Sequence, residues 1–345
     1  MKKSIFKAYW LVALTICMLA SCTSQKEEIE TNNTTPNEIV TRKNVRSRST
    51  LPPVSNLYDL PAYIGALHNA GIYAFVEYVN ENNLSPYTEC DFTDEMIETF
   101  AQNYVIEHLC DFEYLCDFDI ELDTNILSAY GILLDSILSC DMEVADINNC
   151  IDEATADFYA EYAIVSPDDI IYEVVKEITK ATNTLWGEEW DFEQQSFIFP
   201  YSTFAGRSIE TGDASGENTN DPEREEEDSE EEKKKDQQEL KKADLGGAIM
   251  GGIKGAKIGV NAGIATGGGA VITGAWGALI GAAVGAVGAS ILEHVTQEIV
   301  EEAKIIEPEN VYQNTYLYDY LLRLQHINPT KYQELFGGKF DGFIY

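Results

Sequence analysis

Residues 246–290 read GGAIMGGIKGAKIGVNAGIATGGGAVITGAWGALIGAAVGAVGAS, and this stretch decides how the chain folds. Glycine recurs at every fourth position in each half, at Gly247, Gly251, Gly255, Gly259, Gly263 and Gly267, and again at Gly277, Gly281 and Gly285. Because four residues turn an α-helix by about 400°, these positions share one face that carries no side chain. Glycine costs a helix about 1 kcal/mol relative to alanine, so close backbone packing must offset the loss. The spacing therefore predicts that these glycines pack helix against helix.

The same stretch predicts a helical hairpin over residues 244–300. Three consecutive glycines from Gly267 break the four-residue step, which favours a turn between antiparallel helices at about 245–266 and 270–300. The 35 residues from Ile258 carry no charge, and the second helix is long enough to span a bilayer. Two interpretations follow. The hairpin self-associates or enters a membrane, or it is the packed core of a soluble body.

Residues 51–204 form the predicted main domain, which is strongly acidic. The whole chain has a net charge of −36, and residues 51–200 hold 31 acidic residues against only two bases, Lys176 and Lys180. Such a field repels nucleic acid and anionic head groups, which excludes polyphosphate partners. The charge suits a cation or a basic surface as partner, or it only keeps the domain soluble.

Apolar residues in this domain recur at helical spacing, so the predicted fold class is mostly α. We expect helices at about 57–79, 93–109, 123–138 and 143–163, and one that starts at Ser166. Asp123 is a candidate cap of the third helix. Short strands are expected at 118–122, where apolar and acidic residues alternate, and at 196–200.

The rest of the body divides into a linker and a tail. Residues 205–243 are a predicted disordered linker, with room for a charged helix at its end, because runs of glutamate and lysine cannot build a core. Residues 301–345 are rich in Tyr and Leu and predict one amphipathic helix and a shorter one.

Residues 1–21 have the layout of a signal peptide. Lysines precede an apolar segment, and small residues lead to Cys22. Leu19-Ala20-Ser21-Cys22 resembles the lipobox of bacterial lipoproteins, although an ordinary secretory leader shares the earlier features. The resemblance implies cleavage before Cys22 and acyl chains on that residue, enough for stable anchoring in a lipid bilayer. Residues 22–50 would then be a flexible stalk.

Three residues after the lipobox refine the expected location. Lys26, Glu27 and Glu28 resemble the export signal of Gram-negative surface lipoproteins, a lysine followed by acidic residues. The resemblance implies the outer leaflet of the outer membrane and exposure at the cell surface. A plain polar tether is the alternative.

Residues 239–292 resemble the double-glycine leader and glycine zipper of two-peptide class II bacteriocins. The match consists of Glu239-Leu240, the pair Gly246-Gly247 and the glycine step that follows. The pattern departs from the family in one extra residue of spacing and in Asp244, which stands where an apolar residue is expected. The resemblance therefore implies a membrane-active segment, with antagonism or pore formation as its role, rather than a processed peptide.

Five cysteines remain after Cys22: Cys90, Cys110, Cys116, Cys140 and Cys150. Their odd number allows at most two disulfides, and the sequence does not fix the pairing. Several of them are expected as small buried hydrophobic residues.

No catalytic residue, metal site or cofactor is expected. The chain has no P-loop, no GxSxG and no HExxH. The alternating acidic residues from Asp117 lack the glycine and the bidentate glutamate of an EF-hand, since Leu122 and Ser128 stand in their places. A weak cation site of another kind stays open there. His68 follows an apolar helical run and is expected to pack or to cap a helix. We therefore expect a non-enzymatic protein.

Overall fold

The computed structural model describes residues 51–84, 93–116, 118, 120, 122–164, 169–192, 197, 222–265 and 274–344, without the side chains of 222–230, 232 and 258–265. Within these residues the fold is mostly α, as predicted, and no β-strand is present. The predicted signal peptide and stalk lie outside the described residues.

The first half of the described chain is a series of helices. They are η1 (Leu57–Asp59), α2 (Leu60–Glu81), α3 (Asp94–Leu109), η2 (Cys110–Cys116), α4 (Thr124–Leu138), α5 (Val144–Tyr162), α6 (Ile170–Thr184) and η3 (Leu185–Glu189). The side chain of Thr93 accepts a hydrogen bond from the backbone N–H of Met96 at 3.2 Å and starts α3. Asp123 starts α4 in the same way, through the N–H of Asn125 at 2.9 Å. These caps satisfy N–H groups that a helix leaves free at its start.

The sequence predicts short strands at 118–122 and at 196–200. The first prediction is wrong for the described residues of that stretch, which form no strand. Phe118, Ile120 and Leu122 pack against the core as partly buried side chains of an irregular segment. One short strand has no partner for its backbone groups, and a lone strand is not stable in water. The stretch 196–200 lies outside the described residues except for Phe197.

The hairpin consists of α8 (Pro222–Ala265) and α9 (Gly274–Ile305). Helix α8 starts well before the glycine stretch, within the charged region predicted as linker, because glutamate, lysine and glutamine favour helix. Side chains hold this part of α8 in place. Gln297 of α9 donates a hydrogen bond to the carbonyl oxygen of Asp236 at 3.1 Å. Lys234 lies 3.6 Å from the carboxylate of Asp141, beyond the end of α4.

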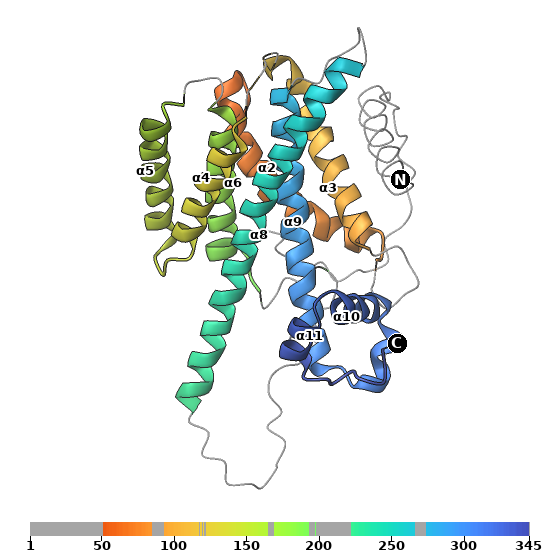
Figure 1. Cartoon of the computed structure of the whole chain (residues 1–345). Helices are drawn as coiled ribbons and strands as arrows, with labels where there is room; N and C mark the ends of the chain where they lie inside the picture. The colour runs from red at the N-terminus through yellow and green to blue at the C-terminus, as the bar shows by residue number, and fades with distance from the viewer. Residues whose placement is uncertain are drawn as a thin grey trace, which may run out of the picture.

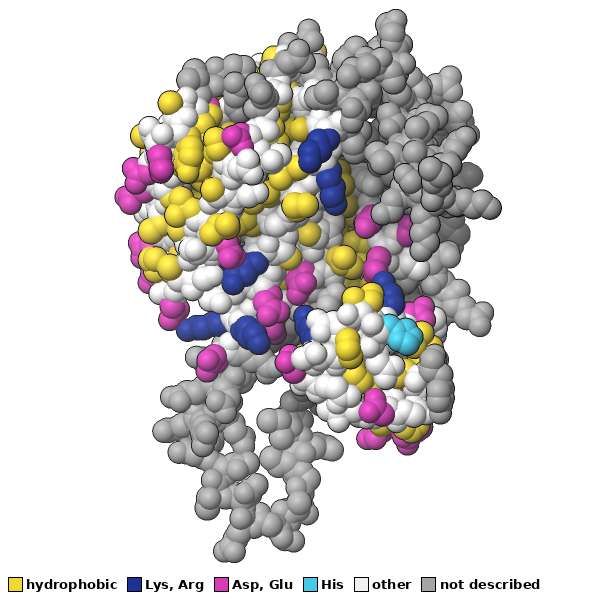
Figure 2. All heavy atoms as spheres, viewed as in Figure 1, with side chains coloured by type: hydrophobic (Ala, Val, Ile, Leu, Met, Phe, Trp, Pro, Cys, Tyr) yellow, Lys and Arg dark blue, Asp and Glu magenta, His cyan; other side chains and the backbone are white. Residues whose placement is uncertain are grey.

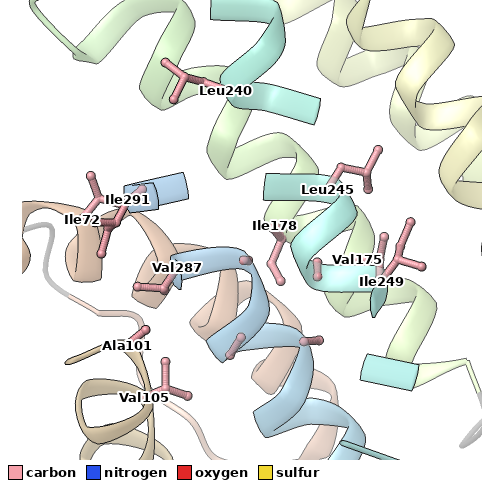
Figure 3. Packing of buried hydrophobic residues seen from close by; sticks show 14 of the residues in the cluster. Ile72, Ala101, Val105, Val175, Ile178, Leu240, Leu245, Ile249, Val287 and Ile291 are labelled. Carbon is pink, nitrogen blue, oxygen red and sulfur yellow. The ribbon is translucent and has the colours of Figure 1, made fainter. Parts of the chain in front are cut away.

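The hairpin runs through the middle of the molecule (Figure 1). Helices α2, α3 and α6 pack against α9, and α4 and α6 pack against α8. Figure 3 shows the result at close range: Ile249 of α8 lies beside Val175 of α6, and Val287 of α9 lies between Ile72 of α2 and Ala101 of α3. The segments 51–204 and 244–300, expected as two domains, therefore share one hydrophobic core.

The tail is helical, with the predicted longer and shorter helix. Its elements are η4 (Pro308–Gln313), α10 (Thr315–Ile327) and α11 (Pro329–Phe336). Asp94 at the start of α3 accepts hydrogen bonds from the hydroxyl of Tyr316 at 2.6 Å and from the guanidinium of Arg323 at 2.5 Å. These contacts attach α10 to the main bundle, beside the C-terminal end of α9 (Figure 1).

The surface divides by side-chain type. On the face where α8 lies in front, hydrophobic side chains cover much of the upper bundle (Figure 2). Charged side chains of both signs gather lower, where α8 leaves the bundle (Figure 2).

Candidate functional site

Paired glycines bring the two backbones of the hairpin into contact. Gly247 faces Gly285, Gly251 faces Gly281 and Gly255 faces Gly277. A Cβ atom built on Gly251 would overlap the carbonyl oxygen of Gly281, and one built on Gly281 would overlap that of Gly251. Gly259 and Gly263 continue the step in α8, and Gly267 lies outside the described residues. The seam of the hairpin is therefore a contact that any side chain would block.

One side of this seam is open and apolar. The α9 residues along it are only partly buried: Gly277, Ile280, Gly281, Val284, Gly285, Gly288, Ala289 and Leu292. Ile97 and Ala101 of α3 form one wall, and Met250 and Lys254 of α8 form the other. The hollow between these walls, here called the hairpin groove, holds about 410 Å³. That volume lies within the range of small-ligand pockets.

The hairpin groove has ends of opposite charge. Lys254 lies at the end where Gly255 faces Gly277. Glu98 lies toward the opposite end, one helical turn from Ala101, whose Cβ is 3.6 Å from a Cβ built on Gly288. Lys254 and Lys257 are both exposed, and neither pairs with a carboxylate among the described residues. In this acidic chain, the groove therefore has a free basic end.

A buried polar cluster fixes α8 to the surrounding helices. Asp244, which is fully buried, accepts hydrogen bonds from Thr182 Oγ1 and, at 2.8 Å, from Trp186 Nε1. Nε2 of His68, also fully buried, lies 3.3 Å from the same carboxylate oxygen. Asn69 lies 2.8 Å from the other ring nitrogen of His68. Since a buried charge is stable only with such partners, the cluster defines the position of α8 in the bundle.

His294 of α9 lies in an aromatic cage. Its ring centroid is 4.5 Å from that of Phe197, 5.3 Å from that of Trp190 and 5.4 Å from that of Trp186. Burial lowers the pKa of His294 from 6.5 to about 3, because the cage does not solvate a charged ring. The neighbouring carboxylate of Glu298, 3.6 Å away, accepts a hydrogen bond from the N–H of Phe197. His294 is therefore neutral at ordinary pH and serves packing.

The acidic surface carries a second, smaller hollow of about 340 Å³ beside Tyr159 and Glu173. The Tyr159 hydroxyl donates a hydrogen bond to Glu173 at 3.0 Å, and burial with the nearby negative charge raises the pKa of that hydroxyl. Lys176 pairs with the same carboxylate. No group of three potential metal ligands occurs among the described residues. Asp117, Asp119 and Glu121, where a weak cation site stayed open, lie outside them.

The predicted sites divide between described and undescribed residues. Cys22, Lys26, Glu27, Glu28 and Cys90 lie outside the described part of the chain. Of the other four cysteines, Cys116 is buried, Cys110 and Cys150 are half-buried and Cys140 is exposed. Gly246 and Gly247, the pair of the leader-like pattern, lie inside helix α8.

Sequence reasoning missed Asp244 and Lys254. Asp244 stands four residues after Leu240 and four before Ala248, both of which are fully buried. That spacing alone indicates a carboxylate on the buried face of the helix, where it needs partners. The open side of α9 gave no signal, because that helix is apolar on every face as far as Leu292.

Comparisons of the chain with protein-family models, curated proteins and solved structures found no match.

Proposed function

We propose that this chain is a lipid-anchored, non-enzymatic binding protein of the cell envelope, with the glycine hairpin as the packed core of a soluble body. Acylated Cys22 would hold it in the outer membrane, with the body at the cell surface. The observation that carries the proposal is the environment of α9. Among the described residues, α9 is the helix with the length and hydropathy of a membrane span, and 61% of its apolar window is buried inside the protein.

Burial of this kind favours a structural role for α9. Leu279, Val287 and Ile291 are fully buried between the surrounding helices. Each such side chain contributes about 1.5–3 kcal/mol when removed from water. Withdrawal of the hairpin would also expose the apolar faces of α2, α3 and α6. The bundle therefore holds its hairpin strongly in water.

The segment between the proposed anchor and the body is long enough to hold the body away from the membrane. The 28 residues after Cys22 span up to roughly 90 Å when extended, about twice the length of the 32-residue α9. The acidic charge of the body would be repelled by anionic lipid head groups, which favours a body held clear of the membrane surface.

The proposal is tested with the unacylated mature chain, residues 23–345, in buffer without detergent. We expect a folded monomer by size-exclusion chromatography with light scattering. Aggregates that dissolve only in detergent would contradict a soluble core.

A second candidate function is membrane insertion of the hairpin, for antagonism or pore formation. The apolar length of α9 favours it. The discriminating variant carries Ala101→Cys and Gly288→Cys, where the Cβ atoms would be 3.6 Å apart, as a disulfide requires. The oxidised form ties α9 to α3, and the reduced form is the matched control. Leakage of dye from liposomes by the reduced form alone would establish insertion and reject the soluble-core proposal.

The location is tested separately on intact cells that express the whole chain. We expect protease treatment to remove peptides from residues 51–192, and mass spectrometry to find an acylated N-terminal Cys22. Full protection of those peptides, with lysed cells as control, would place the body inside the outer membrane.

A further inference from the structure

We propose that the hairpin groove binds one long-chain fatty acid, with its methylene chain along the seam and its carboxylate at Lys254. This inference rests on the proposed binding function and names the ligand class. The fatty-acid proposal can be wrong even if the body is a soluble monomer, as proposed above.

The lining of the groove suits a methylene chain. Ile280, Val284 and Leu292 present partly buried apolar side chains, and glycine backbone lies between them. On the α8 wall, Met250 is 52% exposed. An apolar surface left open to water in this way is stabilised when an apolar ligand covers it.

The dimensions favour a chain over a helix. From Gly277 to Leu292 the groove extends about 22 Å along α9, at 1.5 Å for each residue. Its volume of about 410 Å³ then corresponds to a mean cross-section of about 18 Å². A helix with its side chains is about 10 Å wide and needs a cross-section of about 80 Å². Ala101 of α3 bounds the groove at Gly288.

Charge sets the orientation of the ligand. Lys254 lines the basic end of the groove and has no ion pair among the described residues. Glu98, toward the opposite end, would repel a carboxylate placed there. The ligand therefore lies with its head at Lys254 and its tail toward Leu292.

Two other occupants fit less well. A helix from a second copy, about 10 Å wide, exceeds the mean cross-section of the groove. The acyl chains expected on Cys22 are joined to neutral thioether, ester and amide groups, which leave Lys254 without an anion.

The test uses delipidated chain 23–345 and the fluorescent fatty acid cis-parinaric acid. We expect saturable binding of one molecule for each chain, with displacement by palmitate. Hexadecanol has the same chain without the charge, and we expect it to displace the probe at least tenfold more weakly. Equal displacement by both compounds would overturn the assigned role of Lys254.

Two variants locate the site. Gly288→Leu fills the groove, whereas Gly246→Leu places the same side chain on the exposed face of α8, where a Cβ meets no atom within 4 Å. We expect at least a tenfold loss of affinity in the first variant and none in the second. Lys254→Glu, at an exposed residue, should weaken binding similarly and keeps the test valid if Gly288→Leu unfolds. Unchanged binding in Lys254→Glu, or in folded Gly288→Leu, would overturn the proposal.

Further outcomes identify a different occupant and so also overturn it. One is a dimer of chain 23–345 that binds no probe and that Gly288→Leu dissociates. Another is binding of the probe by the unacylated chain but not by the acylated chain. That result would mean that the lipid on Cys22 occupies the groove.

Discussion

Asp244 accepts a hydrogen bond of 2.8 Å from the indole nitrogen of Trp186. Asp244 stands three residues before Gly247, the first glycine of α8 that contacts α9. The bond joins α8 to the short helix η3 at a fully buried position. Asp244 departs from the leader-like pattern that surrounds it. Its role in the structure is to connect the hairpin with its covering helices.

Replacement of Asp244 should therefore destabilise the whole bundle. Asp244→Leu leaves the indole of Trp186 and the hydroxyl of Thr182 without an acceptor, and we expect a loss of about 3 kcal/mol in the free energy of unfolding. Asp244→Asn keeps an acceptor oxygen and should lose less. Chemical denaturation followed by circular dichroism measures both. Asp141→Asn, at an exposed surface ion pair, is the control and should change little.

A loss in Asp244→Leu no larger than that in Asp141→Asn would contradict the anchoring role of this carboxylate. A loss confined to α8, seen as protease cleavage near residue 244 without global unfolding, would contradict the single shared core.

The sequence predicted the hairpin and its contact face because glycine at every fourth residue destabilises a helix unless two backbones approach closely along that face. It also predicted the positions of most helices, since apolar spacing and capping residues are local signals. It did not predict which helices cover the hairpin. That arrangement depends on side chains distant in sequence, such as His68 and Asp244.

The seam glycines should be intolerant of any side chain. Gly281→Ala places a methyl group on the carbonyl oxygen of Gly251 and must separate the helices, so we expect a loss of about 2 kcal/mol or more. Gly246→Ala meets nothing within 4 Å and should raise stability by about 0.5–1 kcal/mol through helix propensity. Thermal denaturation of the two variants should shift in opposite directions. A stabilised Gly281→Ala would show that the helices do not touch there.

The boundary of the hairpin shows what local signals leave out. Charged residues before 244 predicted a linker, because they cannot form a core of their own. In the structure they extend α8, since the helix started by the buried part continues at low cost through good helix formers. The sequence also did not predict which side of α9 stays open, because that depends on which helices cover its other sides.

The described cysteines should react at very different rates. Cys140 is exposed, whereas Cys116 is fully buried, and burial raises the pKa of the Cys116 thiol to about 12. In chain 23–345 with Cys90→Ser, we expect a thiol reagent at pH 8 to modify Cys140 quickly and Cys116 only on unfolding. Peptide mapping after timed labelling provides the measurement. In denaturant without reductant, we expect the reagent to label all four cysteines that remain in this variant. Labelling of fewer than four would reveal a disulfide.

His294 should make stability depend on pH below neutrality. Burial lowers its pKa in the folded state to about 3, against about 6.5 in the unfolded chain. Between these pH values the unfolded chain binds a proton that the folded chain does not. The contribution of His294 is therefore fully present above pH 6.5 and falls by up to about 1.4 kcal/mol for each pH unit toward pH 3.

Many carboxylates titrate over the same range, so the measurement is a difference between two proteins. His294→Phe keeps an aromatic ring among Trp186, Trp190 and Phe197 and removes the titrating group. Unfolding free energies from urea titrations at pH 7, 6, 5 and 4 give the difference at each pH. We expect the variant to gain stability relative to the native chain steadily below pH 6.5. A difference that is constant with pH would mean that the ring of His294 is reached by water and is protonated in the folded state as easily as in the unfolded chain.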